Sequence, residues 1–451
     1  MAVGKTLVFV VTFLSYGLYH SARKTLSGVK SSVTEDWLDN ATHIPLFNND
    51  AEAKTFLGTL DAVFMIAYAT GLFFWGWLGD RSNPKYVIVT GMVGSAVTMV
   101  LFGAVPLWWN LYNAPYYVFT YSLFGFLQAC GWPSEIAIMA NWFGKANRGF
   151  IMGMWASCQS LGNVFGSYFT AIVLPLGYQF TFLGGALLML IGAAVVMVSI
   201  NVKPKDADYS DMEETNQTER TSAPEGEPIS IIKAILLPGV LAYCLCNACL
   251  KLVNYAFFFW LPLYLTEAYQ WDEAKADELS IWYDIGGIVG SVTGGYISDK
   301  LGYRSPLIVL MLSASLGALF IYSHAGPALV WNAFLMTIVG ITISGPYNLI
   351  VGTISIDLGS QPILANNAQA MATVSGLLDG TGSAGSAVGQ LFVPLMQNRF
   401  GWQSVFYLFM ALNLLAIVCI LKRCLLDLRS LLSTSRSSER TPLLNEEQFD
   451  E

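Results

Sequence analysis

Twelve apolar blocks, each about twenty residues long, constrain the fold of this chain more than any other feature. A helix of about that length crosses a hydrocarbon core roughly 30 Å thick. A backbone inside hydrocarbon must pair its own polar groups, which favours helices. The sequence therefore predicts an all-α membrane protein of twelve transmembrane helices. Their predicted positions are 6–28, 56–78, 86–106, 115–140, 149–174, 178–201, 236–267, 280–298, 305–323, 328–351, 367–396 and 402–422.

Charged residues are too few for a soluble protein. Of the 451 residues, 54% are hydrophobic and 12% are charged, whereas a soluble domain usually carries about 25% charged residues. The net charge of −8 comes from loops and tails and leaves no basic groove, so we expect no nucleic acid partner. The first apolar run, Thr6–Tyr19, is too short to span a membrane, so we expect its helix to continue through Arg23 and Lys24.

The blocks divide into two halves of six. We assign residues 1–202 to an N-terminal half, 203–230 to an acidic cytosolic linker, 231–422 to a C-terminal half and 423–451 to a disordered cytosolic tail. The loops that follow the second and the eighth block share one pattern: a glycine, an acid beside a base, and a second base. Its residues are Gly76, Asp80, Arg81 and Lys85 in the first loop and Gly295, Asp299, Lys300 and Arg304 in the second.

This repeated pattern resembles the signature loop of the major facilitator superfamily. In that superfamily two six-helix halves are related by an axis along the membrane normal. The resemblance implies a mechanical role, in which the acid meets a helix N-terminus and holds the halves in one conformational state. A short solvated turn is the alternative interpretation of each loop.

Basic residues predict the orientation, because cytosolic loops carry an excess of lysine and arginine. With both termini in the cytosol, 16 of the 23 lysines and arginines face the cytosol, 3 lie within spans and 4 face the other side. Those four are Lys30, Lys54, Lys275 and Arg399. The same topology places the glycosylation sequon at Asn40 in the first lumenal loop.

Two cations fall at the end of the first span, where a charge at membrane depth suggests a functional site. Arg23 follows Tyr19 by one helical turn and Tyr16 by two, so the three share a helix face. A guanidinium suits a phosphate because its planar fork donates two hydrogen bonds to two oxygens. Lys24 points elsewhere on the same helix. The alternative is that Arg23 and Lys24 only anchor the lumenal end of the helix by snorkelling.

A third cation, Lys251, falls near the middle of the seventh span, where snorkelling is difficult. Asn254 lies one turn beyond it, and Tyr255 is close by. One cation in the first helix of each half is the arrangement that we expect for a dianion held between the halves. We therefore predict that Arg23 and Lys251 hold a phosphoryl group and that Tyr16, Tyr19, Asn254 and Tyr255 shape the site.

Four acids within the spans also require an explanation: Asp61, Glu135, Asp284 and Asp379. We interpret them as structural groups or as counter-ions that pair with the cations when substrate is absent. Carrying protons is the alternative role. Glu135 comes directly after the segment Gly131–Ser134, in which Pro133 frees backbone carbonyls and bends the helix.

The sequence does not suggest an enzyme. The three histidines, His20, His43 and His324, are scattered, and no nucleophile–base pair or phosphate-binding glycine loop appears. The cysteines lie in or next to apolar blocks, where packing is the simpler interpretation than a metal site. We expect no cofactor and no bound metal.

Longer strings resemble the organophosphate:phosphate antiporters and, more narrowly, the eukaryotic sugar phosphate exchanger family. The resemblance implies the major facilitator fold and the exchange of a phosphorylated organic anion for inorganic phosphate. It places the first-helix arginine of the family on Arg23. The fifth-helix histidine of the bacterial antiporters falls on Gln159, and their seventh-helix cation falls on Asn254, whereas here the cation is Lys251. The strings are Arg23–Lys24, Gly79–Lys85, Gly131–Pro133, Asn141–Lys145, Ala248–Tyr255, Phe257–Pro262, Leu279–Asp284 and Asp379–Ser383.

Two alternative functions stay open. One is a proton-coupled lysosomal exporter of organic anions that uses Glu135 or His20. The other is an anion sensor, or a subunit of a membrane complex, that does not transport. The signature pattern is intact in both halves, which favours a protein with moving parts and hence transport.

The C-terminal tail suggests a destination. Glu439, Leu443 and Leu444 fit the acidic dileucine pattern that clathrin adaptors read. We therefore expect a multi-pass protein of the lysosomal or late endosomal membrane, with the endoplasmic reticulum membrane as the alternative. The expected partners are a small phosphorylated anion, inorganic phosphate, the lipid bilayer and clathrin adaptors, and an accessory membrane subunit is left open.

Overall fold

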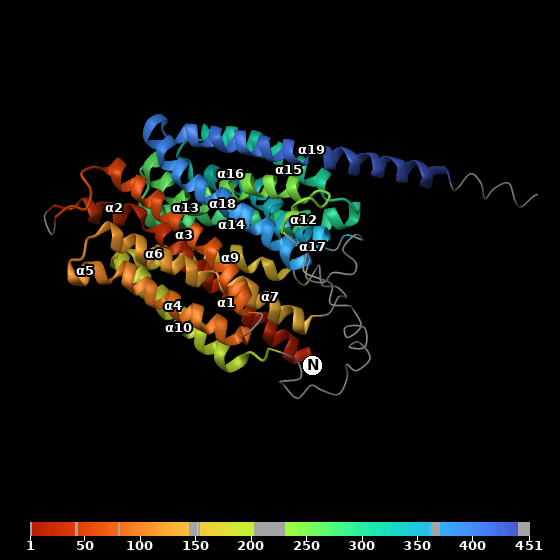
Figure 1. Ribbon diagram of the computed structural model, residues 1–451. Coiled ribbons are helices and arrows are strands. Elements are labelled where there is room, and N and C mark those ends of the chain that lie inside the picture. The colour runs from red at the N-terminus through yellow and green to blue at the C-terminus, as the bar shows by residue number, and fades with distance from the viewer. Residues whose placement is uncertain are drawn as a thin grey trace, which may run out of the picture.

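The protein is a bundle of long helices in two halves, seen here in a computed structural model (Figure 1). The described residues are 2–40, 44–79, 82–143, 151, 154–202, 231–359, 361 and 370–440, and they contain no strand. The first half contains α1 (Ala2–Gly28), α2 (Lys30–Leu38), α3 (Asp50–Gly79), α4 (Pro84–Gly103), α5 (Val105–Trp109), α6 (Ala114–Gln128), α7 (Gly131–Trp142), α9 (Cys158–Val173), the 3₁₀ helix η1 (Leu174–Leu176) and α10 (Tyr178–Ser199). The second half contains α12 (Ile231–Ile235), α13 (Val240–Tyr269), α14 (Glu273–Leu301), α15 (Ser305–Ser323), α16 (Leu329–Leu349), the π helix η3 (Ile350–Ile354), α17 (Ser355–Gly359), α18 (Ala370–Phe400) and α19 (Trp402–Arg440).

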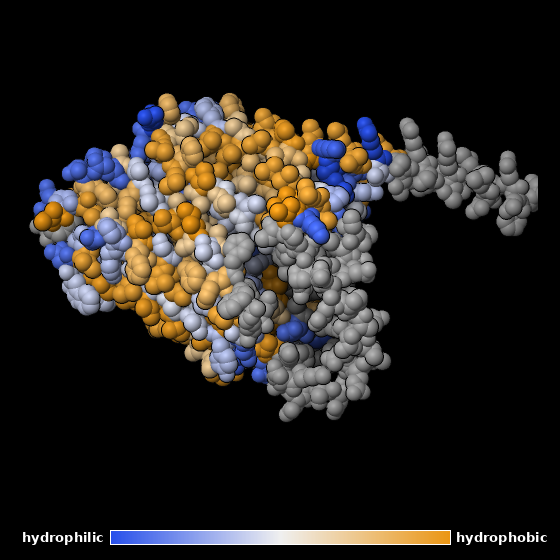
Figure 2. Space-filling view, viewed as in Figure 1, coloured by the Kyte–Doolittle hydropathy of each residue, from blue (hydrophilic) through white to orange (hydrophobic). Residues whose placement is uncertain are grey.

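Each of the twelve predicted spans falls on one or two of these helices over its described residues, which confirms the all-α membrane fold. Parts of the spans 149–174 and 367–396 lie outside the described residues. Seven helices of the described part are long and apolar enough to cross a membrane by themselves. The other predicted spans fall on shorter or more polar helices, such as α9 and α14. Apolar residues cover the flank between hydrophilic residues near the two ends (Figure 2), as expected of a surface in contact with lipid.

The fourth predicted span, 115–140, is divided into α6 and α7 by a break at Ala129 and Cys130. Pro133 follows the break, and a proline cannot donate the backbone hydrogen bond that would continue the helix across it. The sequence analysis anticipated the bend but not the contact beside it. The carbonyl of Gln128, at the end of α6, accepts a hydrogen bond of 3.4 Å from Arg23 on another helix.

The two halves meet through α1, α3 and α9 on one side and α13, α14 and α18 on the other. We call the end of the bundle where α1 begins the terminal face, and the end that carries α2 the opposite face. Contacts between the halves hold the opposite face closed: Lys54 Nζ lies 2.7 Å from Glu267 Oε1, and Ser27 Oγ donates to the Phe258 carbonyl at 2.7 Å. Toward the terminal face the ribbons of the two halves spread apart (Figure 1).

Helices α14 and α16 approach closely because glycines face the partner backbone. A Cβ atom on Gly286 would overlap the Thr337 carbonyl, and one on Gly340 would overlap the Tyr283 carbonyl. Gly290 has the same relation to Ile341, whose carbonyl oxygen would lie 2.6 Å from an added Cβ. Small residues at four-residue spacing allow such contact. The two helices therefore form a tightly packed pair within the second half.

The last helix differs from the prediction. The sequence predicts a disordered tail from Arg423, but α19 continues as one helix to Arg440. Asp427, beyond the predicted end of the span, is buried and accepts a hydrogen bond of 2.5 Å from Ser305 Oγ. A contact with α15 thus extends α19 past the last apolar block. Residues 441–451 lie outside the described part.

Candidate substrate site

Arg23 lies on α1, and residues of two other helices hold its guanidinium. Its Nε donates a hydrogen bond of 2.9 Å to Gln128 Oε1, and the Gln128 amide in turn donates to Ser95 Oγ at 3.1 Å. The guanidinium carbon lies 4.7 Å from the centroid of the Tyr68 ring on α3, a cation–π contact. The side chain is buried. The sequence analysis missed Gln128 and Tyr68, because neither is near Arg23 in the chain.

Lys251 lies on α13 and is paired with an acid of α18. Its Nζ donates to Asp379 Oδ1 at 2.6 Å and to Ser383 Oγ at 2.9 Å. The Lys251 side chain is 2% exposed, whereas that of Asp379 is 18% exposed. In this conformation the ammonium group of Lys251, which the sequence analysis assigned to the substrate, is thus paired with the carboxylate of Asp379. The Asp379 side chain is partly accessible.

Two tyrosines connect the cations of the two halves. The ring centroid of Tyr255 is 5.3 Å from Lys251 Nζ, and Tyr255 is also a neighbour of Arg23. Tyr68, whose ring lies against Arg23, is a neighbour of Lys251 and Asp379 as well. Arg23 and Lys251 therefore share aromatic neighbours at the centre of the interface between the halves.

A polar cavity between the halves borders this centre. Three predicted site residues, Gln159, Asn254 and Tyr255, line it, whereas Arg23 and Lys251 do not. The Asn254 side chain is oriented by the hydroxyl of Tyr283, which donates to its Oδ1 at 2.6 Å. Asp284, predicted as a structural group or counter-ion, also lines the cavity. The other lining residues are His20, which was named only for an alternative function, and Ser160, Asn163, Phe258, Ser344, Tyr347 and Asn348, which the sequence analysis did not connect with the site.

Tyr16 and Tyr19, predicted on the face of Arg23, have different surroundings. The Tyr16 ring centroid lies 5.9 Å from the guanidinium carbon of Arg23 and 5.1 Å from the ring of Trp132. The hydroxyl of Tyr19 instead donates to the Ile88 carbonyl at 2.9 Å, so this side chain holds α1 against α4. Tyr16 borders the arginine, whereas Tyr19 serves packing within the first half.

Lys24, the other cation at the end of α1, reaches across to the second half. Its Nζ donates to the Phe258 carbonyl at 2.8 Å and lies 4.9 Å from the centroid of the Phe258 ring. Its ammonium interacts electrostatically with Asp284 and Asp277 on α14. Lys24 is fully buried, so it does not snorkel to an interface.

The other three acids occupy separate places. Glu135 accepts a hydrogen bond of 2.8 Å from Ser15 within the first half. Asp284 lines the polar cavity and accepts from Asn163 at 2.8 Å. Asp61 forms a 2.5 Å ion pair with Lys30. The sequence analysis counted Lys30 among the basic residues on the lumenal side, outside the predicted spans. In the structure it is the first residue of α2 and is completely buried.

The second signature loop forms a network of ion pairs. The guanidinium of Arg304 donates to Asp299 at 3.0 Å and to Asp357 on α17 at 2.6 Å. Lys300 lies over the ring of Tyr296, 4.5 Å from its centroid, and Gly295 faces open space. Arg304 thus links the end of α14 to α17. In the first loop Gly76 belongs to α3 and Lys85 to α4, but Asp80 and Arg81 lie outside the described residues.

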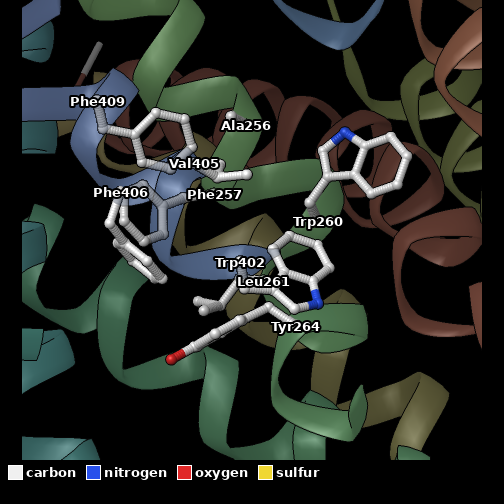
Figure 3. A pocket seen from close by; sticks show the side chains of 9 residues that line it. All are labelled: Ala256, Phe257, Trp260, Leu261, Tyr264, Trp402, Val405, Phe406 and Phe409. Atoms are coloured by element: carbon white, nitrogen blue, oxygen red, sulfur yellow. The ribbon is translucent and has the colours of Figure 1, made fainter. Parts of the chain in front are cut away.

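A second pocket lies between α13 and α19, and it is lined by nine apolar or aromatic residues (Figure 3). In the figure Phe406, Phe409 and Trp402 of α19 face Phe257 and Tyr264 of α13. None of the nine is charged. Since no cation lines it, we treat this pocket as packing within the second half.

The predicted modification and sorting residues are partly described. Asn40 is exposed beyond the end of α2, but the rest of its sequon lies outside the described residues. Glu439 is in the last turn of α19, and Leu443 and Leu444 lie outside the described part.

Comparison with known proteins identifies the family. The family described as Major Facilitator Superfamily matches residues 12–361. The chain is 42% identical to sugar phosphate exchanger 3 of Xenopus laevis, over 95% of this chain and 94% of that protein. The chain belongs to the sugar phosphate exchanger family of the major facilitator superfamily. The predicted family is thereby confirmed.

Other relatives agree with this assignment. Sugar phosphate exchanger 3 of Homo sapiens is 42% identical over 92% of this chain and 91% of that protein. The putative glycerol-3-phosphate transporter 1 of Arabidopsis thaliana is 33% identical, with coverage of 97% and 92%. These proteins are named as exchangers or transporters, which confirms that the chain is a transporter and not an enzyme.

A solved structure supports the fold. A bacterial homologue of the human lysosomal transporter Spinster, in an inward-facing and unoccupied conformation, superimposes with a TM-score of 0.68. The match covers 95% of this chain and 98% of that chain, at 13% identity. Since the identity is so low, this comparison supports the major facilitator fold alone.

Proposed function

We propose that this protein carries phosphorylated organic anions across a membrane by alternating access, in exchange for inorganic phosphate. The names of its relatives support the substrate class, since they include sugar phosphate exchangers, a glycerol-3-phosphate transporter and a glucose-6-phosphate exchanger. Two buried cations, one from the first helix of each half, supply the charge that a phosphoryl dianion requires.

The ion pair between Lys251 and Asp379 carries the proposal. A carboxylate 2.6 Å from the ammonium group satisfies Lys251 when no anion is bound. A phosphoryl group enters from the accessible side of Asp379 and takes over the ammonium group, while Arg23 donates its bidentate fork to two other phosphoryl oxygens. The substrate is therefore bound by both halves and draws them together.

The organic part of the substrate lies in the polar cavity. Gln159, Asn163, Asn254 and Asn348 present amide groups there, and amides both donate and accept hydrogen bonds. Hydroxyl groups of a sugar or of glycerol match such a lining. Alternating access then consists of rocking the halves about this centre, limited at the terminal face by the signature loops.

Transport in liposomes tests the proposal. The purified protein is reconstituted in vesicles loaded with phosphate, and uptake of labelled phosphate, glycerol 3-phosphate and glucose 6-phosphate is measured. We expect uptake that requires phosphate inside the vesicle and that is lost in Arg23→Ala and in Lys251→Ala. Tyr19→Phe is the matched control, because Tyr19 holds α1 to α4 and not the anion. Normal exchange in both cation variants would refute the site.

We further propose that both termini face the cytosol and that the protein resides in lysosomal or late endosomal membranes, where clathrin adaptors deliver it through Glu439, Leu443 and Leu444. The basic residues of the loops and the dileucine string support this. A tagged protein with Leu443 and Leu444 replaced by alanine should move to the cell surface. A variant that still reaches lysosomes would exclude the dileucine string as the sorting signal. Retention of the unaltered protein in the endoplasmic reticulum would favour the alternative location.

A further inference from the structure

Asp277 on α14 is a buried carboxylate that the transport mechanism above does not use. Its side chain is 0% exposed. Among the described residues neither of its two carboxylate oxygens has a hydrogen-bond partner. It lies at the interface between the halves, against the backbone of α1, since a Cβ atom on Gly28 would overlap the carboxylate. Asp277 is thus enclosed when the opposite face is closed.

A second acid, one helical turn earlier, provides a contrast. Glu273 accepts hydrogen bonds from the backbone N–H groups of Ser31 and Ser32, at 2.8 and 3.2 Å, and from the hydroxyl of Ser32. These donors belong to the first turn of α2, where a negative charge is favourable. Glu273 is therefore supplied with the groups that stabilise an ionised carboxylate, and Asp277 is not.

The charged groups around Asp277 do not compensate for its burial. Glu273 and Lys24 are the charges that act on it. Lys24 is shared, because it also interacts with Asp284 and donates its hydrogen bond to the Phe258 carbonyl. On α2, Lys30 is held by Asp61.

Two other helices that pack on α14, α9 and α16, offer neutral groups. Helix α9 brings Ser167 beside Ser280 and Asn163 beside Asp284. Helix α16 contains no acidic or basic residue. Two carboxylates in this region, Asp277 and Asp284, thus share one lysine, and the one without hydrogen bonds is Asp277.

We propose that Asp277 is a proton-binding site whose occupancy is tied to closure of the opposite face. An ionised carboxylate in a dry interface without donors is costly, whereas the protonated acid is neutral. When the halves separate at the opposite face, α1 and α2 leave α14, and water reaches Asp277, which then ionises. Proton binding at Asp277 regulates the transport proposed above. Only this regulatory role rests on the proposed function; the proton site itself does not.

The direction of the pH effect follows from which state holds the proton. The closed opposite face binds the proton more tightly than the open one does, so lowering the pH favours closure and raising the pH favours opening. Acid on the side of the opposite face therefore shifts the carrier toward the conformation that is accessible from the terminal face.

A measurement of the distance between the halves at the opposite face tests this proposal directly. Thr55 on α3 and Asn398 on α18 are exposed and adjacent across the opposite face, with Asn398 Nδ2 3.4 Å from Thr55 Oγ1. Spin labels are attached at Thr55→Cys and Asn398→Cys. Double electron–electron resonance then measures the distance between them, which gives the closed and open populations. Phosphate exchange of the labelled protein is recorded in parallel, in sodium and in choline buffers.

Between about pH 8 and about pH 5, where a buried carboxyl titrates, we expect the closed population of the reference protein to rise several-fold. Asp277→Asn, which mimics the protonated acid in size and charge, should be closed throughout this range. Glu278→Gln, the exposed neighbour on the same helix, and Glu273→Gln should keep the pH response.

Three outcomes overturn the proposal: an unchanged pH response in Asp277→Asn, a response lost only in Glu273→Gln, or a response that depends on sodium instead of pH. A normal pH response without any phosphate exchange would leave the proton site standing and refute the proposed function. Phosphate exchange without a pH response would refute the proton site and leave the proposed function standing.

Discussion

Lys30 and Asp61 form an ion pair whose two side chains are both 0% exposed, with Lys30 Nζ 2.5 Å from Asp61 Oδ2. The ammonium group also lies over the ring of Trp260 in the other half, 3.6 Å from its centroid. The pair joins α2 to α3 within the first half, and the contact with Trp260 extends it to α13. A buried charge pair thus stands where the opposite face is closed.

Removal of one member of this pair should destabilise the protein. Lys30→Met leaves Asp61 as an uncompensated buried charge, and breaking such a pair costs about 3–5 kcal/mol. We expect a clearly lower midpoint of thermal unfolding in detergent. The double variant Lys30→Met with Asp61→Leu should recover most of the loss, because both charges are then gone. A single variant as stable as the unaltered protein would contradict the burial of the pair.

Arg23→Lys should impair transport although it keeps the charge. Lysine cannot reproduce the hydrogen bond from Nε to Gln128 together with a bidentate contact to phosphate. Loss of one charge-assisted hydrogen bond, about 1.5–3 kcal/mol, corresponds to weaker phosphate binding by roughly ten- to a hundred-fold. Phosphate affinity measured by thermal shift checks this, with Lys233→Arg on α12, an exposed residue, as a control for lysine–arginine exchange away from the site.

Asp379→Asn should strengthen the binding of phosphate. Its carboxylate competes with the anion for Lys251, and the amide keeps the shape without the charge. We expect a lower apparent Kd, by about tenfold if the competing pair is worth about 1.4 kcal/mol. Equilibrium binding of labelled phosphate provides the measurement. Weaker binding in Asp379→Asn would show that the acid supports Lys251 instead of competing for it.

Arg304→Gln should slow transport without weakening binding. It removes the ion pairs to Asp299 and Asp357 that link α14 to α17, far from Lys251. Both acids are more than half exposed, at 68% and 53%, so we expect little change in stability. The rate of phosphate exchange should fall while equilibrium phosphate binding stays the same. A proportional fall in both would mean that the loop affects the site itself.

The sequence predicted the helices well, because each apolar block records one crossing of the membrane. It failed where tertiary contacts override hydropathy. Lys30 was counted outside the spans because the apolar window ends at Gly28, yet it begins α2 and is buried against Asp61 and Trp260. The disordered tail was predicted from the polar residues after Lys422, but Asp427 and Ser305 hold that segment as helix.

The sequence predicted only those site residues that stand out within a single helix. Arg23 and Lys251 stood out because a cation within an apolar block is conspicuous. The groups that orient them, Gln128, Tyr68 and Ser383, are ordinary residues of other helices, and only the packed structure brings them near. Asp277 escaped notice for another reason, since it precedes the predicted span 280–298 and reads as a loop residue.

The glycine contacts between α14 and α16 have a mechanical consequence. Helix α14 carries Glu273 at its first residue and ends near Arg304, and its 29 residues correspond to a rod of about 43 Å. Because its backbone packs directly against that of α16, α14 tilts as a rigid body. A tilt of about 5° moves each end by about 2 Å in opposite directions, given that length. Two ångströms is enough to separate the Glu273 carboxylate from Ser31 at one end, while the other end, near Arg304, moves by the same distance in the opposite direction.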